Sequence, residues 1–262
     1  MDLGIKGKRA ICAGASAGMG KEAAHKLSCA GVDLVMSARG EARLQAAAQE
    51  ISSESSAPVQ AIVADHSTAE GRARLFEACP EPDILVITCA PPRMTPSYLE
   101  VDADEWRDSL ETTLIGPIEM IKDVTVGMEA RGHGRIVMIG TGAAKTPAEI
   151  RLLSGPARSA LCNYVMAISK RLIKSDVTIN NVLPGMFHTA SAAERFGAIA
   201  QENGTTYEEE CAKFAREWNI PSEQFGDPED VGAFTAFLCS KYAGYISGQS
   251  ILIDGGISRS LF

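Results

Sequence analysis

Residues 9–20 read RAICAGASAGMG, and this stretch decides the fold of the chain. Its first five residues form an apolar run of strand length, and the segment from Met19 to Ala30 has a helical pattern. The three glycines between them allow a tight turn and let a diphosphate approach the backbone, and amides at a helix N-terminus attract anions. Because it lies between a strand and a helix, the turn predicts a dinucleotide-binding site, with an ordinary tight turn as the alternative.

The rest of the chain continues the alternation of strand and helix. Further apolar runs of strand length are Val32–Ser37, Val59–Val63, Ile84–Thr88, Arg135–Ile139, Thr178–Leu183 and Ser250–Ile253. Helical patterns separate them, for example Glu41–Ile51 and Ser159–Leu172. Such alternation implies right-handed crossovers and a parallel sheet covered on both faces. We therefore expect a single-domain, doubly wound α/β (Rossmann) fold over residues 1–262, with about seven strands and helices on both faces.

The segment from Met186 to Gly226 departs from this rhythm. It is polar, has helical character and falls between the sixth and seventh expected strands. Because ligands bind at the carboxyl ends of the strands in such folds, a segment at this point in the chain would lie over the active site. We expect a substrate lid within residues 186–226.

Composition excludes several classes of protein. The net charge of −8, without a clustered basic surface, argues against a nucleic-acid partner. The longest apolar runs, such as Ile84–Ile87, are too short to cross a bilayer, and the first residues lack the apolar core of a signal peptide. Seven cysteines without a CxxC pair and four histidines without ligand spacing predict free thiols and no metal site. These features favour a cytoplasmic protein without a membrane or nucleic-acid partner.

Motifs along nearly the whole chain resemble the short-chain dehydrogenase/reductase superfamily. The glycine turn has the GxxxGxG spacing typical of that family, Asp65 follows the third strand, and residues 181–185 read NVLPG. Residues 225–231 (FGDPEDV), 245–249 (YISGQ) and 253–256 (IDGG) resemble its C-terminal signature. The resemblance implies cofactor contacts from Gly14, Ser16, Ala17, Gly18, Met19, Asp65, Ala90, Pro184, Gly185 and Thr189. It also implies a homodimer or homotetramer, and Asp65 alone could instead be a helix cap.

The end of the second strand bears on which dinucleotide is bound. Enzymes specific for NAD normally place an acid there, to accept hydrogen bonds from the ribose 2′-hydroxyl. Here Ala38 occupies that position and Arg39 follows it. A guanidinium suits a 2′-phosphate because it offers charge and a forked set of donors. NADP(H) is therefore the favoured cofactor and NAD(H) remains the alternative, with Arg39 as a solvated surface residue.

The catalytic positions depart from the family pattern. Members of the family use a tyrosine for proton transfer, a lysine four residues later, a serine about 13 residues earlier and an asparagine on a preceding helix. These positions fall on Ser154, Arg158, Thr141 and Thr113 in this chain. Threonine can replace serine as a hydroxyl donor, whereas an aliphatic hydroxyl is a much weaker acid than a phenol. Arg158 keeps the positive charge but does not exchange its proton usefully.

Two other side chains are candidate acids. Lys145, Leu153-Ser154 and Arg158 resemble a pattern of a divergent branch of the family. That branch is similar to 3-oxoacyl-[acyl-carrier-protein] reductases and has a lysine at the position of Lys145. If partly buried, Lys145 could act as acid or electrostatic stabiliser beside Ser154; otherwise it is a solvated loop residue. His188 could also supply a proton or simply pack in the lid.

The remaining tyrosines do not replace the missing one. Tyr164 stands six residues before Lys170, not four, and we interpret it as a packing residue. Tyr98 lies on the loop after the fourth strand, from which it could reach the substrate.

These observations predict an atypical NADP(H)-dependent oxidoreductase acting on a carbonyl or secondary alcohol of a small organic or acyl-thioester-like substrate. In this hypothesis Thr141 and Ser154 orient the substrate oxygen, Arg158 binds the ribose or stabilises negative charge, and Lys145 or His188 supplies the proton. One alternative is a non-catalytic cofactor-binding homologue, either a regulator or an inactive partner subunit. Another is an enzyme that uses the bound dinucleotide for non-redox chemistry.

Overall fold

The computed structural model describes residues 1–259, which form a seven-stranded, entirely parallel sheet. The strands are β1 (Arg9–Ala13), β2 (Asp33–Ala38), β3 (Val59–Val63), β4 (Ile84–Thr88), β5 (Gly134–Ile139), β6 (Val177–Pro184) and β7 (Ser250–Ile253). Their order is β3-β2-β1-β4-β5-β6-β7, with every neighbouring pair parallel. The expected doubly wound α/β fold is confirmed, and each strand begins and ends within one residue of its expected limits.

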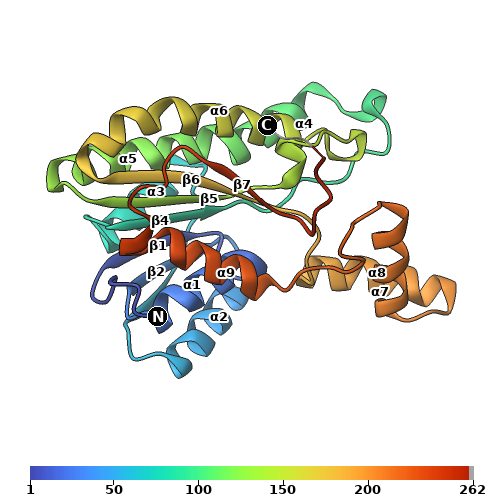
Figure 1. Ribbon diagram of the computed structural model, residues 1–262, viewed down its shortest axis with the longest axis horizontal. Helices are drawn as coiled ribbons and strands as arrows, with labels where there is room; N and C mark the ends of the chain where they lie inside the picture. Colours follow the sequence, from blue (N-terminus) through green and yellow to red (C-terminus); the bar gives the residue numbers. More distant parts are fainter. Residues whose placement is uncertain (260–262) are drawn as a thin grey trace.

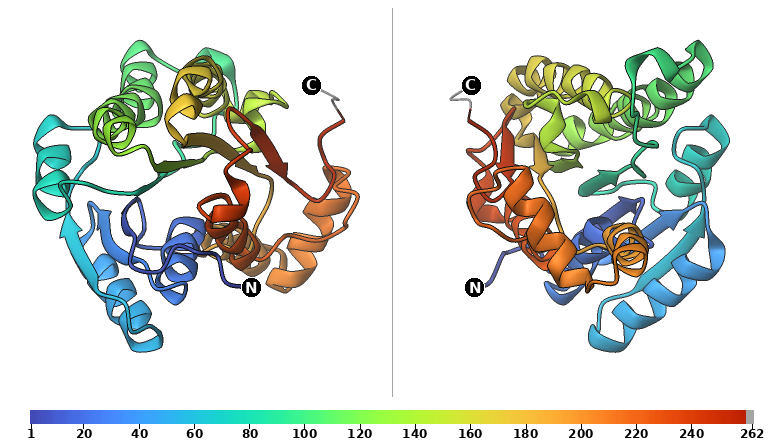
Figure 2. Two further views of the ribbon diagram at one scale, coloured as in Figure 1. Left: turned by 60° about the vertical axis from the view of Figure 1, so that its left-hand side comes forward. Right: turned by 90° about the vertical axis from the view of Figure 1, so that its right-hand side faces the viewer.

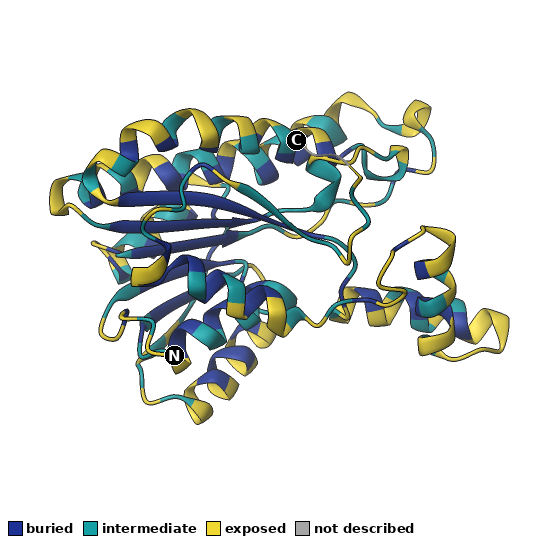
Figure 3. Ribbon diagram, in the orientation of Figure 1, coloured by how far each residue is buried: buried dark blue, intermediate teal, exposed yellow. Residues whose placement is uncertain are grey.

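Helices cover both faces of the sheet, as Figure 1 shows. They are α1 (Gly18–Cys29), α2 (Glu41–Glu54), α3 (Ala69–Ala78), α4 (Ala103–Leu110), α5 (Gly116–Arg131), α6 (Gly155–Leu172), α7 (Ala190–Asn203), α8 (Tyr207–Glu217) and α9 (Pro228–Leu238). Successive residues of a strand point to opposite faces. In β1, Ala10 and Cys12 therefore pack in one core with α1, α2 and α9, whereas Ile11 packs in a second core with α3, α5 and α6. Figure 3 shows the buried strands between helices whose outer faces are exposed.

The strand order places a switch point at the centre of the sheet. From β1 the chain moves outward through β2 and β3, and then returns to β4 on the other side of β1. The loops that leave β1 and β4 therefore diverge, and ligands of doubly wound folds bind in the crevice that this divergence opens. The candidate cofactor residues follow these two strands and their neighbours.

Helix α6 begins earlier than the sequence predicted. We expected a start at Ser159, but the helix begins at Gly155 with Pro156 in its first turn. Proline is favoured there because its missing N–H has no partner at a helix start in any case. A Cβ on Gly155 would lie 2.9 Å from the carbonyl oxygen of Ala143, so the close approach of the preceding loop requires glycine. This start makes Ser154 the first flanking residue of the helix and places Arg158 in its first turn.

Residues 186–226 form a small helical unit at the carboxyl ends of the strands. Helices α7 and α8 enclose their own apolar core, which contains Phe196, Ala215 and Phe225. The unit follows β6 and lies beyond the end of the sheet, as Figures 1 and 2 show in orange. One parallel bridge between Phe187 and Gly226 joins its two ends.

No helix within residues 1–259 is long and apolar enough to cross a membrane.

Candidate functional site

The glycine turn presses against the end of β4. Gly14 has a φ of +75°, and a Cβ added to it would lie 2.0 Å from the carbonyl oxygen of Thr88. The amides of Gly14 and Ala15 donate to the carbonyl oxygen of Ser37 at 2.8 and 3.0 Å. Gly20 is equally constrained, because its Cβ would lie 2.5 Å from the Gly14 oxygen. The backbone path requires glycine at these positions and leaves the start of α1 uncovered by side chains.

The start of α1 offers unpaired donors to an anion. Its first flanking residue is Ala17, which has no side chain able to cap the helix, and its first turn contains no acidic residue. Thr189 at the start of α7 lies close by, since its Cγ2 is 3.6 Å from the Cβ position of Gly18. Free amides and the positive end of the helix dipole suit a diphosphate. The cradle therefore fits a dinucleotide, with Ser16, Ala17 and Met19 half-buried around it.

Arg39 and Asp65 lie together at the ends of β2 and β3. The Arg39 side chain is 66% exposed, and its Nη1 is 3.9 Å from Asp65 Oδ2. Asp65 Oδ1 accepts hydrogen bonds from the Ser67 amide at 3.0 Å and the Ser67 hydroxyl at 2.7 Å. Partial burial opposes ionisation, but these bonds and nearby positive charge hold the pKa of Asp65 below its usual range. The helix-cap alternative for Asp65 is wrong, because Thr68 caps α3.

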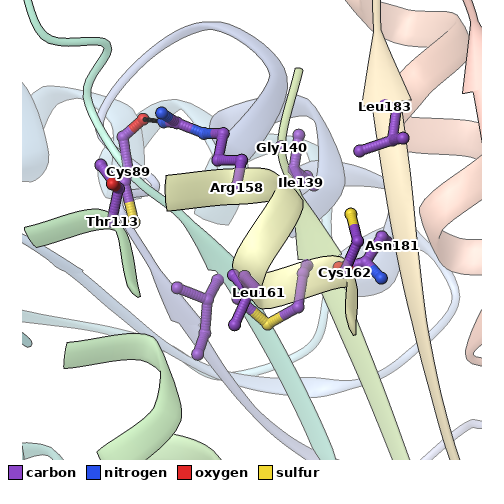
Figure 4. A pocket seen from close by; sticks show the side chains of 11 residues that line it. Cys89, Thr113, Ile139, Gly140, Arg158, Leu161, Cys162, Asn181 and Leu183 are labelled. Carbon is purple, nitrogen blue, oxygen red and sulfur yellow. Dashed lines mark hydrogen bonds between the residues drawn. The ribbon is translucent and has the colours of Figure 1, made fainter. Parts of the chain in front are cut away.

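Ser154 and Arg158 form a buried pair at the start of α6. Arg158 Nη1 donates to Ser154 Oγ at 2.8 Å, and Nη2 donates to the carbonyl oxygen of Cys89 at 3.2 Å, as Figure 4 shows for the second bond. Burial holds the pKa of the Arg158 guanidinium below its usual range. Among residues 1–259 no carboxylate lies within 4.0 Å of this guanidinium. A buried cation without a counter-ion is costly and is a recognised sign of a functional site.

A cavity of about 10 Å³ adjoins Arg158 and has room for about one water molecule. Thr113 lines it from a π-helical segment, Glu111–Ile115, that joins α4 to α5. The Thr113 hydroxyl donates to the Ser109 carbonyl oxygen at 2.7 Å. Such π-helical bulges occur frequently at functional sites. The structure thus places Thr113, at the position expected for the family's asparagine, beside Arg158, at the position expected for its lysine.

Thr141 and Lys145 flank the short turn after β5. Thr141 Oγ1 accepts a hydrogen bond from the Ala143 amide at 3.4 Å, and Lys145 follows on the exposed part of the turn. Lys145 is exposed, so the alternative of a solvated loop residue is the one that the structure bears out, and the condition of partial burial is not met. Burial raises the pKa of the Cys162 thiol, which lines the cavity beside Arg158.

His188 packs within the helical unit of residues 186–226. Its Nδ1 is 2.8 Å from the Tyr207 hydroxyl, and its ring centroid is 5.5 Å from that of Phe225. His188 is nevertheless exposed, and both its packing role and its role as a proton donor stay predictions. The packing interpretation of Tyr164 is confirmed, because it lies against the second core. Tyr98 is 64% exposed on the loop after β4.

The other expected cofactor residues lie at the same edge of the sheet. Ala90 is exposed just after β4, and Pro184 ends β6. A Cβ on Gly185 would lie 2.8 Å from Asp254 Cα, so this glycine packs closely on the turn after β7. The candidate residues thus follow the carboxyl ends of β1 to β6 along one edge of the sheet.

Sequence reasoning missed two features of this edge. Cys89 Sγ lies 3.5 Å from His66 Nε2, and burial lowers the pKa of His66 and raises that of Cys89 to about 11. Arg151, in the turn before α6, has no carboxylate partner within 4.0 Å among the described residues. In the sequence, the one signal for Arg151 is its position three residues before Ser154. No group of three or more His, Cys, Asp or Glu side chains within residues 1–259 is arranged to hold a metal ion.

Comparison with known proteins identifies relatives of the whole chain. Residues 14–258 match a family described as enoyl-(acyl carrier protein) reductase. The chain is 25% identical to the 3-oxoacyl-[acyl-carrier-protein] reductase FabG of Aquifex aeolicus, over 98% of this chain and 100% of that protein. It is similar to the L-sorbose reductase of Gluconobacter frateurii, solved with NADPH and L-sorbose, with a TM-score of 0.94, 26% identity and full coverage of both chains. A short-chain oxidoreductase of Pseudomonas aeruginosa, described as containing an atypical catalytic centre, is 25% identical with a TM-score of 0.90, over 97% of this chain and 98% of that one.

Proposed function

This chain belongs to the short-chain dehydrogenase/reductase superfamily of NAD(P)-dependent oxidoreductases, and on that premise we propose that it is an NADP(H)-dependent carbonyl reductase with an altered catalytic centre. The observation that supports this proposal is the buried hydrogen bond between Arg158 Nη1 and Ser154 Oγ, at the positions where the motif spacing predicts the family's lysine and tyrosine. A guanidinium without a carboxylate partner, bonded to a hydroxyl beside the cofactor cradle, is suited to stabilise negative charge on a substrate oxygen.

The cofactor assignment rests on the cradle and on Arg39. Glycines at 14, 18 and 20 leave the amides at the start of α1 open to a diphosphate, and Thr189 lies beside them. Arg39 is two-thirds exposed and only loosely paired with Asp65, so its donors remain open to a 2′-phosphate. Relatives support this choice: the L-sorbose reductase and the YwfH reductase were both described with NADPH as cofactor.

Ser154 and Thr141 would orient the substrate oxygen. The bound cofactor supplies or accepts the hydride. Because Ser154 Oγ accepts from Arg158, its own O–H remains free to donate to a carbonyl oxygen. The nearby guanidinium favours negative charge on that oxygen and on Ser154 Oγ, which partly compensates for the weak acidity of an aliphatic hydroxyl. Thr141 would add a second hydroxyl from the turn after β5.

Lys145 is the favoured source of the proton. His188 is less suited, because its Nδ1 already lies against the Tyr207 hydroxyl and its ring packs on Phe225. Lys145 is exposed to solvent and ends the turn that begins at Thr141, one of the two hydroxyls proposed to orient the substrate oxygen.

Steady-state oxidation of NADPH with a panel of ketones, 3-oxoacyl thioesters and sugars tests the proposal. We expect turnover with at least one carbonyl compound, and loss of that turnover in Ser154→Ala with unchanged NADPH affinity. Stoichiometric NADPH binding without turnover on any compound would favour the non-catalytic alternative. Reduction confined to an enoyl thioester would contradict carbonyl chemistry.

The unit of α7 and α8 would act as the lid. It follows β6 directly, encloses its own small core, and begins at Thr189 beside the glycine turn. A unit that has its own core can move as a rigid body about the chain connections at its two ends. We expect limited proteolysis within residues 186–226 to slow when NADPH and substrate are both present.

Homo-oligomer formation would use exposed apolar side chains of α5 and α6. Val126 is 73% exposed and Met166 is 55% exposed, and Ile115 at the start of α5 is 43% exposed. Exposed apolar residues gathered on neighbouring helices are typical of an interface. Light scattering after gel filtration should give a dimeric or tetrameric mass, which Val126→Glu should reduce.

A further inference from the structure

His66 and Cys89 join two loops that start from well-separated strands of the sheet. His66 follows β3 and Cys89 follows β4, and both β2 and β1 lie between these strands. His66 Nε2 nevertheless lies 3.5 Å from Cys89 Sγ, which is within hydrogen-bonding range for sulfur. The His66 residue is only 8% exposed. A buried histidine of the loop after β3 therefore contacts the segment that leaves β4.

Both partners of this contact are uncharged near neutral pH. Burial lowers the pKa of His66 and raises the pKa of the Cys89 thiol to about 11. They share a hydrogen bond between neutral groups, in which the tautomer of His66 decides which group donates. Because a nucleophilic cysteine requires a thiolate, this pair is suited to hold Cys89 in place rather than to activate it.

The loop that carries His66 is fixed by the helices around it. Arg72 Nη1 donates to the carbonyl oxygens of His66 and Ser67, at 3.4 and 3.1 Å. The same guanidinium is anchored on α5, because its Nε lies 3.3 Å from Asp123 Oδ2. A Cβ on Gly116, the first residue of α5, would lie 2.7 Å from Ser67 Cα, so this helix packs closely on the loop. His66 therefore offers Cys89 a rigid partner.

Cys89 in turn holds the guanidinium of Arg158. Its carbonyl oxygen accepts a hydrogen bond from Nη2 at 3.2 Å, whereas Nη1 donates to Ser154 Oγ at 2.8 Å (Figure 4 shows the bond to Cys89). These are the two hydrogen bonds of the Arg158 side chain within residues 1–259. Residues 89–97 contain neither helix nor strand, so secondary structure does not fix the Cys89 carbonyl. The orientation of the guanidinium thus depends on what holds Cys89.

The small cavity at this point gives the guanidinium an alternative partner. It has a volume of about 10 Å³ and is lined by Cys89, Thr113 and Arg158. A water molecule in this space would compete with the Cys89 carbonyl oxygen for the donors of Arg158. A fixed Cys89 therefore favours one orientation of the guanidinium over another.

We propose that His66 is a positioning residue, which holds the Cys89 carbonyl oxygen against Arg158 and thereby aims the guanidinium at Ser154. The catalytic role of Arg158 and Ser154 in this proposal rests on the function proposed above. His66 acts only through Cys89. Its effect on the reaction follows because oriented donors stabilise a transition state only when they are already in place.

NMR of protein that contains isotope-labelled arginine tests the arrangement without substrate. The bonded Nη–H groups of Arg158 should exchange slowly with water, and their signals are identified by their absence in Arg158→Met. Signals of Arg135, which is bonded to Asp176, serve as the internal reference. We expect His66→Asn and Cys89→Ala each to speed exchange at Arg158 by about tenfold and to leave Arg135 unchanged.

His66→Gln is the conservative rescue. The amide of glutamine reaches the position of Nε2, which contacts Cys89, whereas the amide of asparagine reaches only the position of Nδ1. Exchange at Arg158 in His66→Gln should therefore stay close to that of the wild type. A role of His66 in packing alone would not distinguish the two amides in this way.

The value of kcat at saturating NADPH, with whichever carbonyl compound is reduced, tests the consequence for the reaction. We expect His66→Asn to lower kcat about tenfold without a change in KM for the carbonyl compound, and His66→Gln to recover most of the loss. The double variant His66→Asn/Cys89→Ala should be no slower than the slower single variant, because both changes remove one contact. His133→Asn is the matched control: His133 also pairs with a neighbouring side chain, Asp176, but precedes β5 at the amino end of the strands. It should keep the wild-type kcat.

The exchange measurement separates this proposal from the proposed function. Wild-type exchange at Arg158 in His66→Asn, or equal effects of asparagine and glutamine, would overturn the positioning role whether or not the protein turns over. Losses in kcat that multiply in the double variant would overturn it as well, because His66 would then act independently of Cys89. Absence of turnover on every carbonyl compound would refute the proposed function, while faster exchange in His66→Asn would still support the hold on Arg158. Cys89→Ala provides the same test if His66→Asn does not fold.

Discussion

Replacement of Arg158 by methionine separates a catalytic role from a structural one. The wild-type guanidinium is 6% exposed, donates to Ser154 Oγ and to the Cys89 carbonyl oxygen, and has no carboxylate partner within residues 1–259. Methionine is unbranched, uncharged and shorter than arginine by about the length of the guanidinium group. The variant therefore removes the charge and keeps an apolar stem at this position of α6.

The expected change in stability is small because two effects oppose each other. Loss of two hydrogen bonds, each worth about 1–3 kcal/mol, destabilises the fold, whereas removal of an uncompensated buried cation relieves a penalty of several kcal/mol. We expect the free energy of unfolding to stay within about 1 kcal/mol of wild type, which is about 2–4 °C in Tm. Loss of charge stabilisation in the transition state should lower kcat about 10²–10³-fold.

Arg135→Met is the matched control, because Arg135 is 4% exposed and paired with Asp176. Asp176 is 51% exposed, so breaking the pair leaves a solvated carboxylate, and the loss of charged hydrogen bonds should cost about 1.5–3 kcal/mol. Thermal unfolding and NADPH oxidation are measured on both variants. The reasoning is refuted if Arg158→Met loses as much stability as Arg135→Met, or if it retains wild-type kcat.

Three further variants test other parts of the account. Gly14→Ala would place a Cβ 2.0 Å from the Thr88 oxygen at a φ of +75°, so calorimetry should show NADPH affinity at least about tenfold weaker; unchanged affinity would contradict the cradle. Arg39→Ala should weaken NADPH binding about tenfold or more and leave NADH binding unchanged, and an equal loss for both would exclude a 2′-phosphate contact. Burial lowers the pKa of His66, so only the unfolded chain takes up a proton near pH 6.5 and stability should fall as the pH drops from about 7.5 to 5.5. In His66→Gln the thermal stability should fall less steeply over this pH range. An unaltered dependence of Tm on pH would show that His66 does not cause the decline.

The sequence predicts the sheet well because its strands are buried on both faces. Runs such as Ile84–Thr88 are continuous and apolar, and each is bounded by turn residues, so their limits are clear. The start of α6 is less clear. Gly155 and Pro156 read as a loop, although proline is well tolerated in a first helical turn, and the closeness of Ala143 that demands Gly155 arises only on folding.

The candidate site is predicted in part for the same reason. Positions at strand ends, such as Gly14 and Pro184, follow from the strands themselves. The burial of a side chain does not, so the exposure of Lys145 and the deep burial of Arg158 emerge only from packing.

Transfer of deuterium from NADPH labelled at C4 of the nicotinamide tests the central claim most directly. The label would be followed by mass spectrometry of the product after a single turnover, once with each stereoisomer of the labelled cofactor. The account predicts that one isomer delivers one deuterium to the carbon of the reduced carbonyl, and that Ser154→Ala and Arg158→Met form this product far more slowly at saturating cofactor. Product without deuterium from both isomers, or labelled product formed at the wild-type rate by these two variants, would contradict it.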